Sequence, residues 1–330
     1  MAQITNQLNI HPLVGHWLAN NTYDGKPSRY LLTATDFCRS VQEVVLSRKL
    51  AAGDIKLLGA PVPVPAADIA TMIRSSLGTA LHDSLERFWT DEGDKAEAAR
   101  NASAMKLSER PLNVRQLKAE IRTDKHLVVD GLEYTISGKF DKLYEGRLYD
   151  YKMTSTYAYN DEGRHESYKI QSSIYRWLNP DIVKDSKASF LEIFSDWNAS
   201  KAAAAEEDKY PHSPVNEVVV ETMSLEETEA FIDNFILQYE AGMQGGELPP
   251  CSPSQLWMGE SRYGYYKSLD QKRASKNFDS DKAAAYLYRD QQGVGHVVEI
   301  PGKANKCNFC PAFAVCDQRK ALQESGALKE

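Results

Sequence analysis

Three strand-like runs in the middle of the 330-residue chain constrain its fold most strongly. They cover residues 114–121, 127–140 and 147–152. Glu145-Gly146 has the composition of a tight hairpin turn between the last two runs. Asp130-Gly131 predicts a turn or a bulge within the second run. The last two runs are therefore expected to pair as an antiparallel hairpin.

Helical periodicity marks segments on both sides of these strands. The segments are 30–50, 68–90, 165–178 and 224–239. Ser224 and Glu227 have the spacing of a capping box at the start of the last segment. A further strand is expected at 188–197. The order helix, three strands, helix, strand predicts an α/β fold with one central mixed sheet flanked by helices.

Changes in composition divide the chain into three parts. A loop with three prolines at 59–66 follows the first helical segment. After Gly245-Gly246 and Pro249-Pro250 the sequence changes to short aromatic and charged pieces. We therefore expect an N-terminal helical segment at 1–67, an α/β core at 68–244 and a C-terminal subdomain at 245–330.

Composition limits the classes of protein and of partner. Hydrophobic residues make up 42% of the chain, enough for a sizeable core, and no apolar run approaches the roughly 18 residues that a membrane helix needs. Residues 1–29 show no secretion signal, so we expect a cytoplasmic protein without a membrane partner. The net charge of −7 argues mildly against a dedicated nucleic-acid binder, unless the basic residues are confined to one groove.

One stretch, residues 261–276, concentrates basic residues and contains only one acidic residue, Asp270. The basic residues are Arg262, Lys267, Lys272, Arg273 and Lys276. Such a stretch is either an ordinary solvated face or a track for phosphate groups outside an active site.

Two carboxylates and a lysine occupy fixed spacings on the last two strand-like runs. Gly138-Lys139-Phe140 leads into Asp141, and eight residues separate Asp141 from Asp150-Tyr151-Lys152. Hard divalent cations prefer oxygen ligands, so carboxylates on adjacent strands can form a binding site for Mg²⁺ or Mn²⁺. A cation held there would neutralise phosphoryl oxygens and supply hydroxide near neutral pH, as hydrolysis of a phosphodiester requires.

Lys152 adds the third element of this chemistry. It lies two residues after Asp150, so both side chains share one face of a strand. Its ammonium can then orient an attacking water or stabilise charge in the transition state. The alternative is a surface hairpin with ordinary charges, because an Asp-x-Lys triplet alone occurs by chance.

Further polar residues accompany this pattern. Gln171 and Tyr175 lie four residues apart on the helix after the strands, where they can hold a nucleic-acid backbone or position Lys152. His82, on the helix before the sheet, would favour Mn²⁺ as well as Mg²⁺ beside the carboxylates, whereas a lone helical histidine is more often structural. Glu120 is either a further acidic candidate or simply exposed.

The five cysteines are unevenly distributed. Cys251, Cys307, Cys310 and Cys316 fall in the last quarter of the chain, and Cys38 stands alone near its start. In a reducing compartment such a cluster indicates metal or cluster ligation before disulfides. The Cys307-x₂-Cys310 pair with Cys316 suits zinc or an iron–sulfur centre equally, and free buried thiols are the remaining alternative. Cys251, after a stiff Pro-Pro turn, is expected as the fourth ligand, with Cys38 as its competitor.

The combined motifs resemble the RecB-like branch of the PD-(D/E)XK nucleases. More narrowly, they resemble CRISPR-adaptation and phage-encoded exonucleases that carry a cysteine-bound iron–sulfur cluster. The resemblance covers about residues 33–316 and implies a restriction-endonuclease-like core with Lys152 as the catalytic lysine. Gln171 and Tyr175 match the motif peculiar to this branch. The implied metal ligands are His82, Asp141, Asp150 and the backbone carbonyl of Tyr151.

The resemblance also favours a [4Fe–4S] cluster over Zn²⁺ as the centre that the cysteines bind. The expected role of this centre is structural, to hold the C-terminal subdomain together. The resemblance implies a DNA exonuclease of recombination, replication or repair, located in the host cytoplasm in the phage-encoded case. The alternatives are a catalytically inactive nucleic-acid-binding or assembly subunit and a zinc-stapled interaction protein. DNA is the expected partner, and a protein partner or a homo-oligomer is left open.

Overall fold

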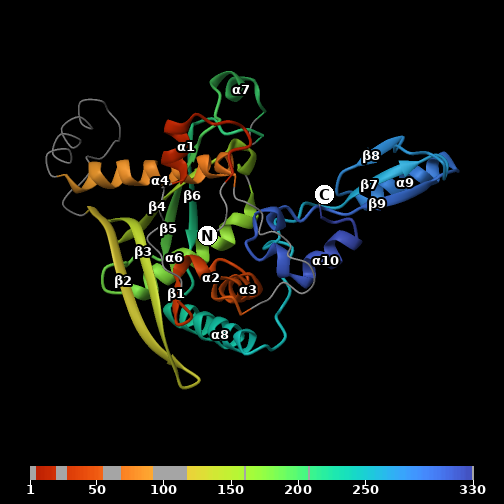
Figure 1. Ribbon diagram of the computed structural model, residues 1–330. Helices are drawn as coiled ribbons and strands as arrows, with labels where there is room; N and C mark the ends of the chain where they lie inside the picture. The colour runs from red at the N-terminus through yellow and green to blue at the C-terminus, as the bar shows by residue number, and fades with distance from the viewer. Residues whose placement is uncertain are drawn as a thin grey trace. The chain divides into compact units, whose positions relative to one another are not determined.

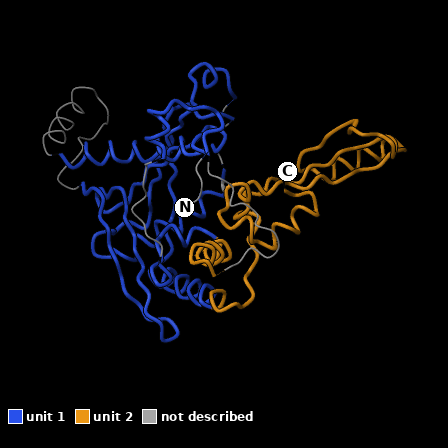
Figure 2. Tube along the Cα trace, in the orientation of Figure 1, with its two compact units in different colours: residues 1–39, 61–240 blue, residues 40–60, 241–330 orange. Residues whose placement is uncertain are grey.

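The computed structural model describes six stretches of the chain, which fall into two compact units. The described residues are 5–19, 28–54, 68–91, 117–159, 161–206 and 209–328. The predicted loop at 59–66 and the start of the first predicted strand lie outside them. The first unit comprises residues 1–39 and 61–240, and the second comprises 40–60 and 241–330 (Figure 2). Residues 40–60 thus group with the C-terminal part of the chain, whereas the sequence suggested an N-terminal segment at 1–67.

A mixed sheet forms the centre of the first unit, as predicted (Figure 1). Its strands are β1 (Leu31–Thr33), β2 (Leu117–Val129), β3 (Leu132–Tyr144), β4 (Arg147–Thr154), β5 (Lys187–Phe194) and β6 (Val215–Glu221). The order is β1-β3-β4-β5-β6, and β2 also pairs with β3. The pairs β1–β3 and β4–β5 are parallel, and the others are antiparallel. The sequence missed β1 and β6.

Strand β3 shares its pairing among three neighbours. It pairs with β2 along most of its length, with β1 at Thr135–Ser137 and with β4 at Lys142–Tyr144. The ladder between β3 and β4 therefore ends at the pair Lys142–Tyr149. Asp141 and Asp150 are the next residues on the two strands. Asp141 lies within β3, although the sequence placed it at a strand end.

The predicted run at 127–140 is divided between β2 and β3. Asp130 and Gly131, with φ angles of +50° and +77°, form a hairpin turn between two long strands, which confirms the turn expected there and places 127–129 in β2. Glu120 has φ of +24°, and the β2–β3 ladder skips both Glu120 and Asp141 opposite it, with the same register on either side.

The first unit contains six α-helices among its described residues. They are α1 (Pro12–Ala19), α2 (Ala34–Phe37), α4 (Ile69–Thr90), α6 (Glu162–Leu178), α7 (Ala199–Ala204) and α8 (Leu225–Met243), with the short 3₁₀ helix η2 (Thr156–Ala158). Of these, α2, α4 and α6 contact the sheet. Helix α4 contacts β2 and β4, and α6 contacts β3, β5 and β6. Gly138 allows α6 to approach β3, because a Cβ there would lie 2.6 Å from Leu178 and 3.0 Å from Tyr175. The capping box of α8 is confirmed by the reciprocal hydrogen bonds of Ser224 and Glu227.

The helix predicted at 30–50 is two helices preceded by a strand. Thr33 ends β1 and caps α2 in a capping box with Asp36, and α2 ends at Cys38. Ser40 then caps α3 (Val41–Ala52) by accepting from the Glu43 amide. Two successive side-chain caps start two helices, which the apolar periodicity alone did not reveal.

The second unit contains a small antiparallel sheet and a separate apolar core. Its elements, besides α3, are β7 (Arg262–Tyr266), β8 (Lys276–Phe278), α9 (Lys282–Gln292), β9 (His296–Ile300), η3 (Asn305–Phe309), η4 (Phe313–Val315) and α10 (Asp317–Glu324). The strand order is β8-β7-β9. The core contains Leu256, Ala304, Cys307 and Leu328. Within the described ranges no helix has the length and apolarity to cross a membrane.

Candidate active site

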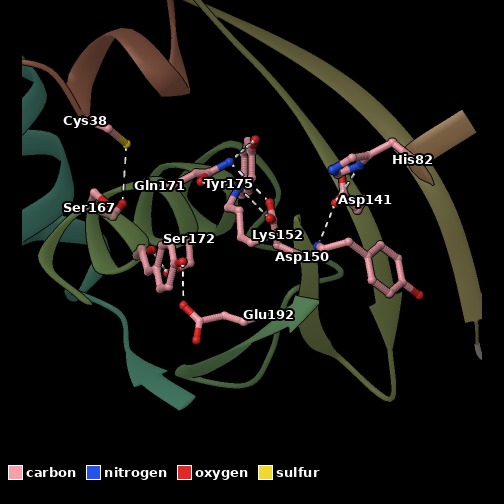
Figure 3. A network of polar contacts seen from close by, with 12 residues as sticks. Cys38, His82, Asp141, Asp150, Lys152, Ser167, Gln171, Ser172, Tyr175 and Glu192 are labelled. Atoms are coloured by element: carbon pink, nitrogen blue, oxygen red, sulfur yellow. Dashed lines mark hydrogen bonds and ion pairs between the residues drawn. The ribbon is translucent and has the colours of Figure 1, made fainter. Parts of the chain in front are cut away.

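Side chains from four elements of the first unit meet beyond the end of the β3–β4 ladder (Figure 3). They are His82 on α4, Asp141 on β3, Asp150 and Lys152 on β4, and Gln171 and Tyr175 on α6. These are the residues that the sequence motifs selected. Each is carried by regular secondary structure, so the sheet and its two flanking helices hold the set in place.

Asp150 and Lys152 form an ion pair that Gln171 holds from the side. Asp150 Oδ2 lies 2.6 Å from Lys152 Nζ. The Gln171 amide contacts both partners, because Nε2 donates to Asp150 Oδ1 and Oε1 accepts from Lys152 Nζ, each at 3.2 Å. The same Nε2 lies 2.8 Å from the Tyr175 hydroxyl oxygen, which accepts its second hydrogen. Helix α6 therefore orients the two charged groups of β4.

Asp141 is held by His82 and by the backbone of β4. Its Oδ2 lies 3.2 Å from His82 Nδ1 and accepts a hydrogen bond of 2.9 Å from the Tyr151 amide. The His82 ring also meets the Tyr151 ring edge-on, with centroids 6.3 Å apart. The side chain of His82 is 32% exposed. It therefore lies beside a carboxylate at a partly open position and not within the apolar core.

Burial and charge act differently on the two carboxylates. Burial raises the pKa of Asp150 to about 6. The positive charge of Lys152 lowers this pKa, and the negative charge of Asp141 raises it further. Burial also favours neutral Asp141, but the hydrogen bond and charge of His82 and the Tyr151 amide outweigh it and lower the pKa of Asp141. That hydrogen bond raises the pKa of His82. Carboxylates with pKa values pushed apart in this way are typical of functional sites.

The donor set fits a hard divalent cation in its chemistry. Asp150 Oδ2 is buried, and the Lys152 ammonium 2.6 Å away compensates its charge. The carboxylate oxygens of Asp141 and Asp150 are the kind of ligand that a hard divalent cation prefers. His82 contacts Asp141, whereas Asp150 contacts Lys152 and Gln171. His82, Asp141 and Asp150 do not converge, since the described His, Cys, Asp and Glu side chains contain no group of three placed around one metal position.

Glu120 belongs to a neighbouring charge cluster and makes no hydrogen bond to Asp150. Its carboxylate is ion-paired with Lys139, and burial together with the neighbouring Glu86 of α4 raises the pKa of Glu120. Sequence reasoning did not select Glu86 or Lys139. The available signal was that Glu86 follows His82 by four residues and so shares its helix face.

In the second unit four cysteines line one cavity. They are Cys251, Cys307, Cys310 and Cys316. The start of α3 contributes two polar contacts to their sulfurs: Gln42 Nε2 donates to Cys316 Sγ at 3.0 Å, and Ser40 Oγ lies 3.0 Å from Cys251 Sγ. Burial raises the pKa of Cys251 and Cys307, and that of Cys310 to about 11. These groups are therefore neutral thiols unless a cation displaces their protons.

Cys38 makes its contacts in the first unit. Its thiol donates to the backbone oxygens of Ala34 and Ser167, each at 3.4 Å. Burial raises the pKa of Cys38 to about 12. The cavity shared by the other four cysteines supports Cys251 as the fourth ligand, and this choice stays a prediction.

No protein-family model matches the sequence, and no curated protein sequence matches it. The fold is similar to that of the solved protein SSO0001, at 18% identity and a TM-score of 0.38, over 70% of this chain and 89% of that one. It is similar to a phage-related exonuclease from Haemophilus somnus at 14% identity and a TM-score of 0.26, over 48% and 72% of the two chains. It is also similar to a structure of an alkaline exonuclease from Laribacter hongkongensis in complex with dAMP, at 14% identity and a TM-score of 0.29, over 64% of this chain and 89% of that one. At these TM-scores only part of the arrangement is shared, so the residues of the site must identify the chemistry.

Proposed function

We propose that the protein is a metal-dependent deoxyribonuclease of the RecB-like PD-(D/E)XK type, acting as an exonuclease in recombination, replication or repair of phage type. The observation that supports this best is the set of contacts around Asp150. A buried carboxylate forms an ion pair of 2.6 Å with Lys152, and Gln171 contacts both groups. The site residues support the proposal, and the weak similarity to solved exonucleases adds nothing to it.

The residues that would hold the cation are His82, Asp141 and Asp150, with the Tyr151 carbonyl as the resemblance implies. When bound, Mg²⁺ or Mn²⁺ would neutralise charge on the scissile phosphate and make hydroxide available near neutral pH. Lys152 lies beside Asp150, where its ammonium can orient the water and stabilise negative charge on the phosphate as it develops. Gln171 keeps that ammonium in position.

The four cysteines of the second unit form the proposed site of a [4Fe–4S] cluster, with Zn²⁺ as the alternative. Four thiols around one cavity have the right ligand chemistry for either centre. Neutral buried thiols would lose their protons on binding. The bound centre would tie the segment of Cys251 to the C-terminal segments that carry Cys307, Cys310 and Cys316. The proposed role is structural.

A digestion assay tests the proposed reaction. Wild-type protein and Asp150→Asn are incubated with Mn²⁺ and either end-labelled linear or circular single-stranded DNA. An exonuclease shortens the linear DNA and leaves the circle intact, and Asp150→Asn leaves both substrates intact. Cleavage of the circle would make the enzyme an endonuclease. Binding of DNA without cleavage by the wild-type protein would favour the inactive-subunit alternative.

A further inference from the structure

We propose that the small sheet of the second unit, β8-β7-β9 with the segment joining β7 to β8, is a second DNA-binding surface that holds a single strand. This inference rests on the proposed function, because it states where the substrate is held outside the active site. Two features of the surface support it: a stacked aromatic pair on the sheet face away from α9 and a group of exposed cations outside the ion pairs of the described residues.

One face of the small sheet is covered by α9, which runs along it (Figure 1). Tyr263 and Tyr265 of β7 are buried, and Tyr265 packs edge-on against Tyr288 of α9 with ring centroids 5.2 Å apart. Successive residues of a strand point to opposite faces of its sheet. Arg262 and Tyr266 therefore belong to the face away from α9.

The face away from α9 carries a stacked aromatic pair. Tyr266 is paired in the sheet with His296 of β9, and their rings stack with centroids 5.5 Å apart at 19°. Gly264 beside them is buried, since a Cβ there would lie 3.0 Å from the Tyr266 ring and 3.1 Å from Ala274 of the connection to β8. Val298, opposite Gly264, is 38% exposed. Partly exposed aromatic rings next to this connection suit stacking of unpaired bases, whereas the bases of a duplex are already stacked on one another.

Four exposed cations lie on β7 and on its connection to β8: Arg262, Lys267, Lys272 and Arg273. Lys276 of β8 pairs with Tyr265 in the sheet, and its ammonium lies 4.4 Å from the Tyr288 ring of α9, so it belongs to the other face. No ion pair found in the described part of the chain includes any of the four exposed cations. Arg289 of the nearby α9, in contrast, is paired with Asp290 at 2.5 Å. Uncompensated positive charge on a chain of net charge −7 indicates an anionic partner.

The connection that carries these cations is internally hydrogen-bonded. Gln271 Oε1 accepts from the Lys267 amide at 3.0 Å, and Gln271 Nε2 donates to Ser275 Oγ at 2.9 Å. The Ser275 amide in turn donates to the Tyr265 carbonyl at 2.8 Å. The cations therefore project from an ordered segment, which reduces the entropy lost when they contact phosphates.

The test compares single-strand binding by two triple variants of the full-length protein. In one, Lys267, Lys272 and Arg273 are changed to Gln. In the matched control, the same charge is removed from exposed lysines of the first unit, by Lys184→Gln, Lys187→Gln and Lys201→Gln. Fluorescence anisotropy of a labelled oligodeoxynucleotide is measured without added divalent cations over a series of salt concentrations.

The first triple variant is expected to lose affinity about tenfold or more relative to the control. Its slope of log affinity against log salt should fall by about 2, because each phosphate contact to a single strand contributes about 0.7. Tyr266→Leu keeps the apolar bulk but removes the ring, and should weaken binding of the single strand more than binding of the duplex.

Three results would overturn the inference. The first is equal binding by the two triple variants. The second is an equal effect of Tyr266→Leu on single strand and duplex, which would leave a phosphate patch without strand preference. The third is tighter binding of RNA than of DNA of matching sequence. Hydrolysis by the wild-type protein with Mn²⁺ is measured separately. If the first triple variant loses binding but the wild-type protein does not hydrolyse DNA, the proposed function alone is refuted. If the wild-type protein hydrolyses DNA but the first triple variant binds as well as the control, this inference alone is refuted.

Discussion

Gln171 and Asp150 are joined by a hydrogen bond of 3.2 Å between the amide Nε2 and the carboxylate Oδ1, across the boundary between α6 and β4. Only one orientation of the amide serves both neighbours, since the ammonium of Lys152 needs an acceptor and the carboxylate needs a donor. One side chain therefore sets the positions of two charged groups. Substitution of Gln171 should disturb the reaction without removing either charged group.

Gln171→Leu keeps the volume of the side chain but removes both contacts. We expect kcat to fall about tenfold or more because the ammonium of Lys152 is no longer held, while Mn²⁺ affinity is retained. Steady-state hydrolysis and calorimetric titration with Mn²⁺ measure the two effects. Gln238→Leu, on α8, is the matched control. Loss of metal binding in Gln171→Leu would make this residue part of the metal site instead. Tyr175→Ala is expected to behave like Gln171→Leu.

Lys152→Ala should reduce hydrolysis by about a hundredfold or more, because it removes the positive charge beside the attacking water. Asp141→Ala and Asp150→Ala should abolish hydrolysis by removing proposed metal ligands. Circular dichroism checks that each variant is folded, and Lys184→Ala provides an exposed lysine control. Wild-type activity in a folded Lys152→Ala protein would refute the catalytic assignment.

The sequence predicted this part of the site because its information is local. Asp150 and Lys152 share a strand face through a period of two, and Gln171 and Tyr175 share a helix face through a spacing of four. The hairpin turn at Glu145-Gly146 then brings the carboxylates of two strands together. No long-range contact had to be inferred except the docking of α6.

The features that the sequence did not predict depend on distant contacts or on short elements. The α2–α3 break follows from two caps, Thr33 and Ser40, inside one apolar pattern. Strands of three to five residues, such as β7, β8 and β9, are too short for a clear period. The contact of Gln42 with Cys316 spans 274 positions, so the grouping of residues 40–60 with the C-terminal part left no local signal.

His82→Ala should lower activity by weakening cation binding, so raising the Mn²⁺ concentration should partly restore it. The reason is that His82 reaches Asp141 from α4, next to the proposed ligands. Activity is measured across a Mn²⁺ titration, with His126→Ala on β2 as the exposed histidine control. If no concentration of Mn²⁺ restores activity, His82 acts through substrate contact or packing.

Stability without a bound cation should depend on the titration of Asp150. Its pKa is about 6 in the folded protein against an ordinary value of 3.8, so the folded state binds the proton more tightly. The stabilisation from neutral Asp150 is then fully present below about pH 4 and lost as the pH rises through about 6. Relative to Asp150→Asn, the wild-type free energy of unfolding should fall by no more than about 3 kcal/mol across this range, at about 1.4 kcal/mol per pKa unit.

Urea unfolding at a series of pH values, without added divalent cations, measures this difference between the two proteins. Adding Mn²⁺ near pH 7 should restore stability to the wild-type protein and have a smaller effect on Asp150→Asn. A difference that is independent of pH would show that Asp150 titrates at its ordinary value in the folded protein.

The last prediction concerns the fourth ligand of the cysteine site. Cys251 lines the same cavity as Cys307, Cys310 and Cys316. Cys38 instead donates to backbone oxygens of the first unit, as a small buried side chain does. The purified protein should therefore be brown with broad visible absorbance, and Cys251→Ser should remove that absorbance while Cys38→Ser retains it.

Iron, sulfide and zinc analysis of the same preparations completes the test. A colourless wild-type protein with stoichiometric zinc would replace the cluster with a zinc site, and loss of that zinc in Cys251→Ser would still identify the fourth ligand. Absorbance lost in Cys38→Ser and kept in Cys251→Ser would assign the ligand to Cys38. That result would also require the end of α2 to move, because the Cys38 thiol now points to the Ser167 carbonyl.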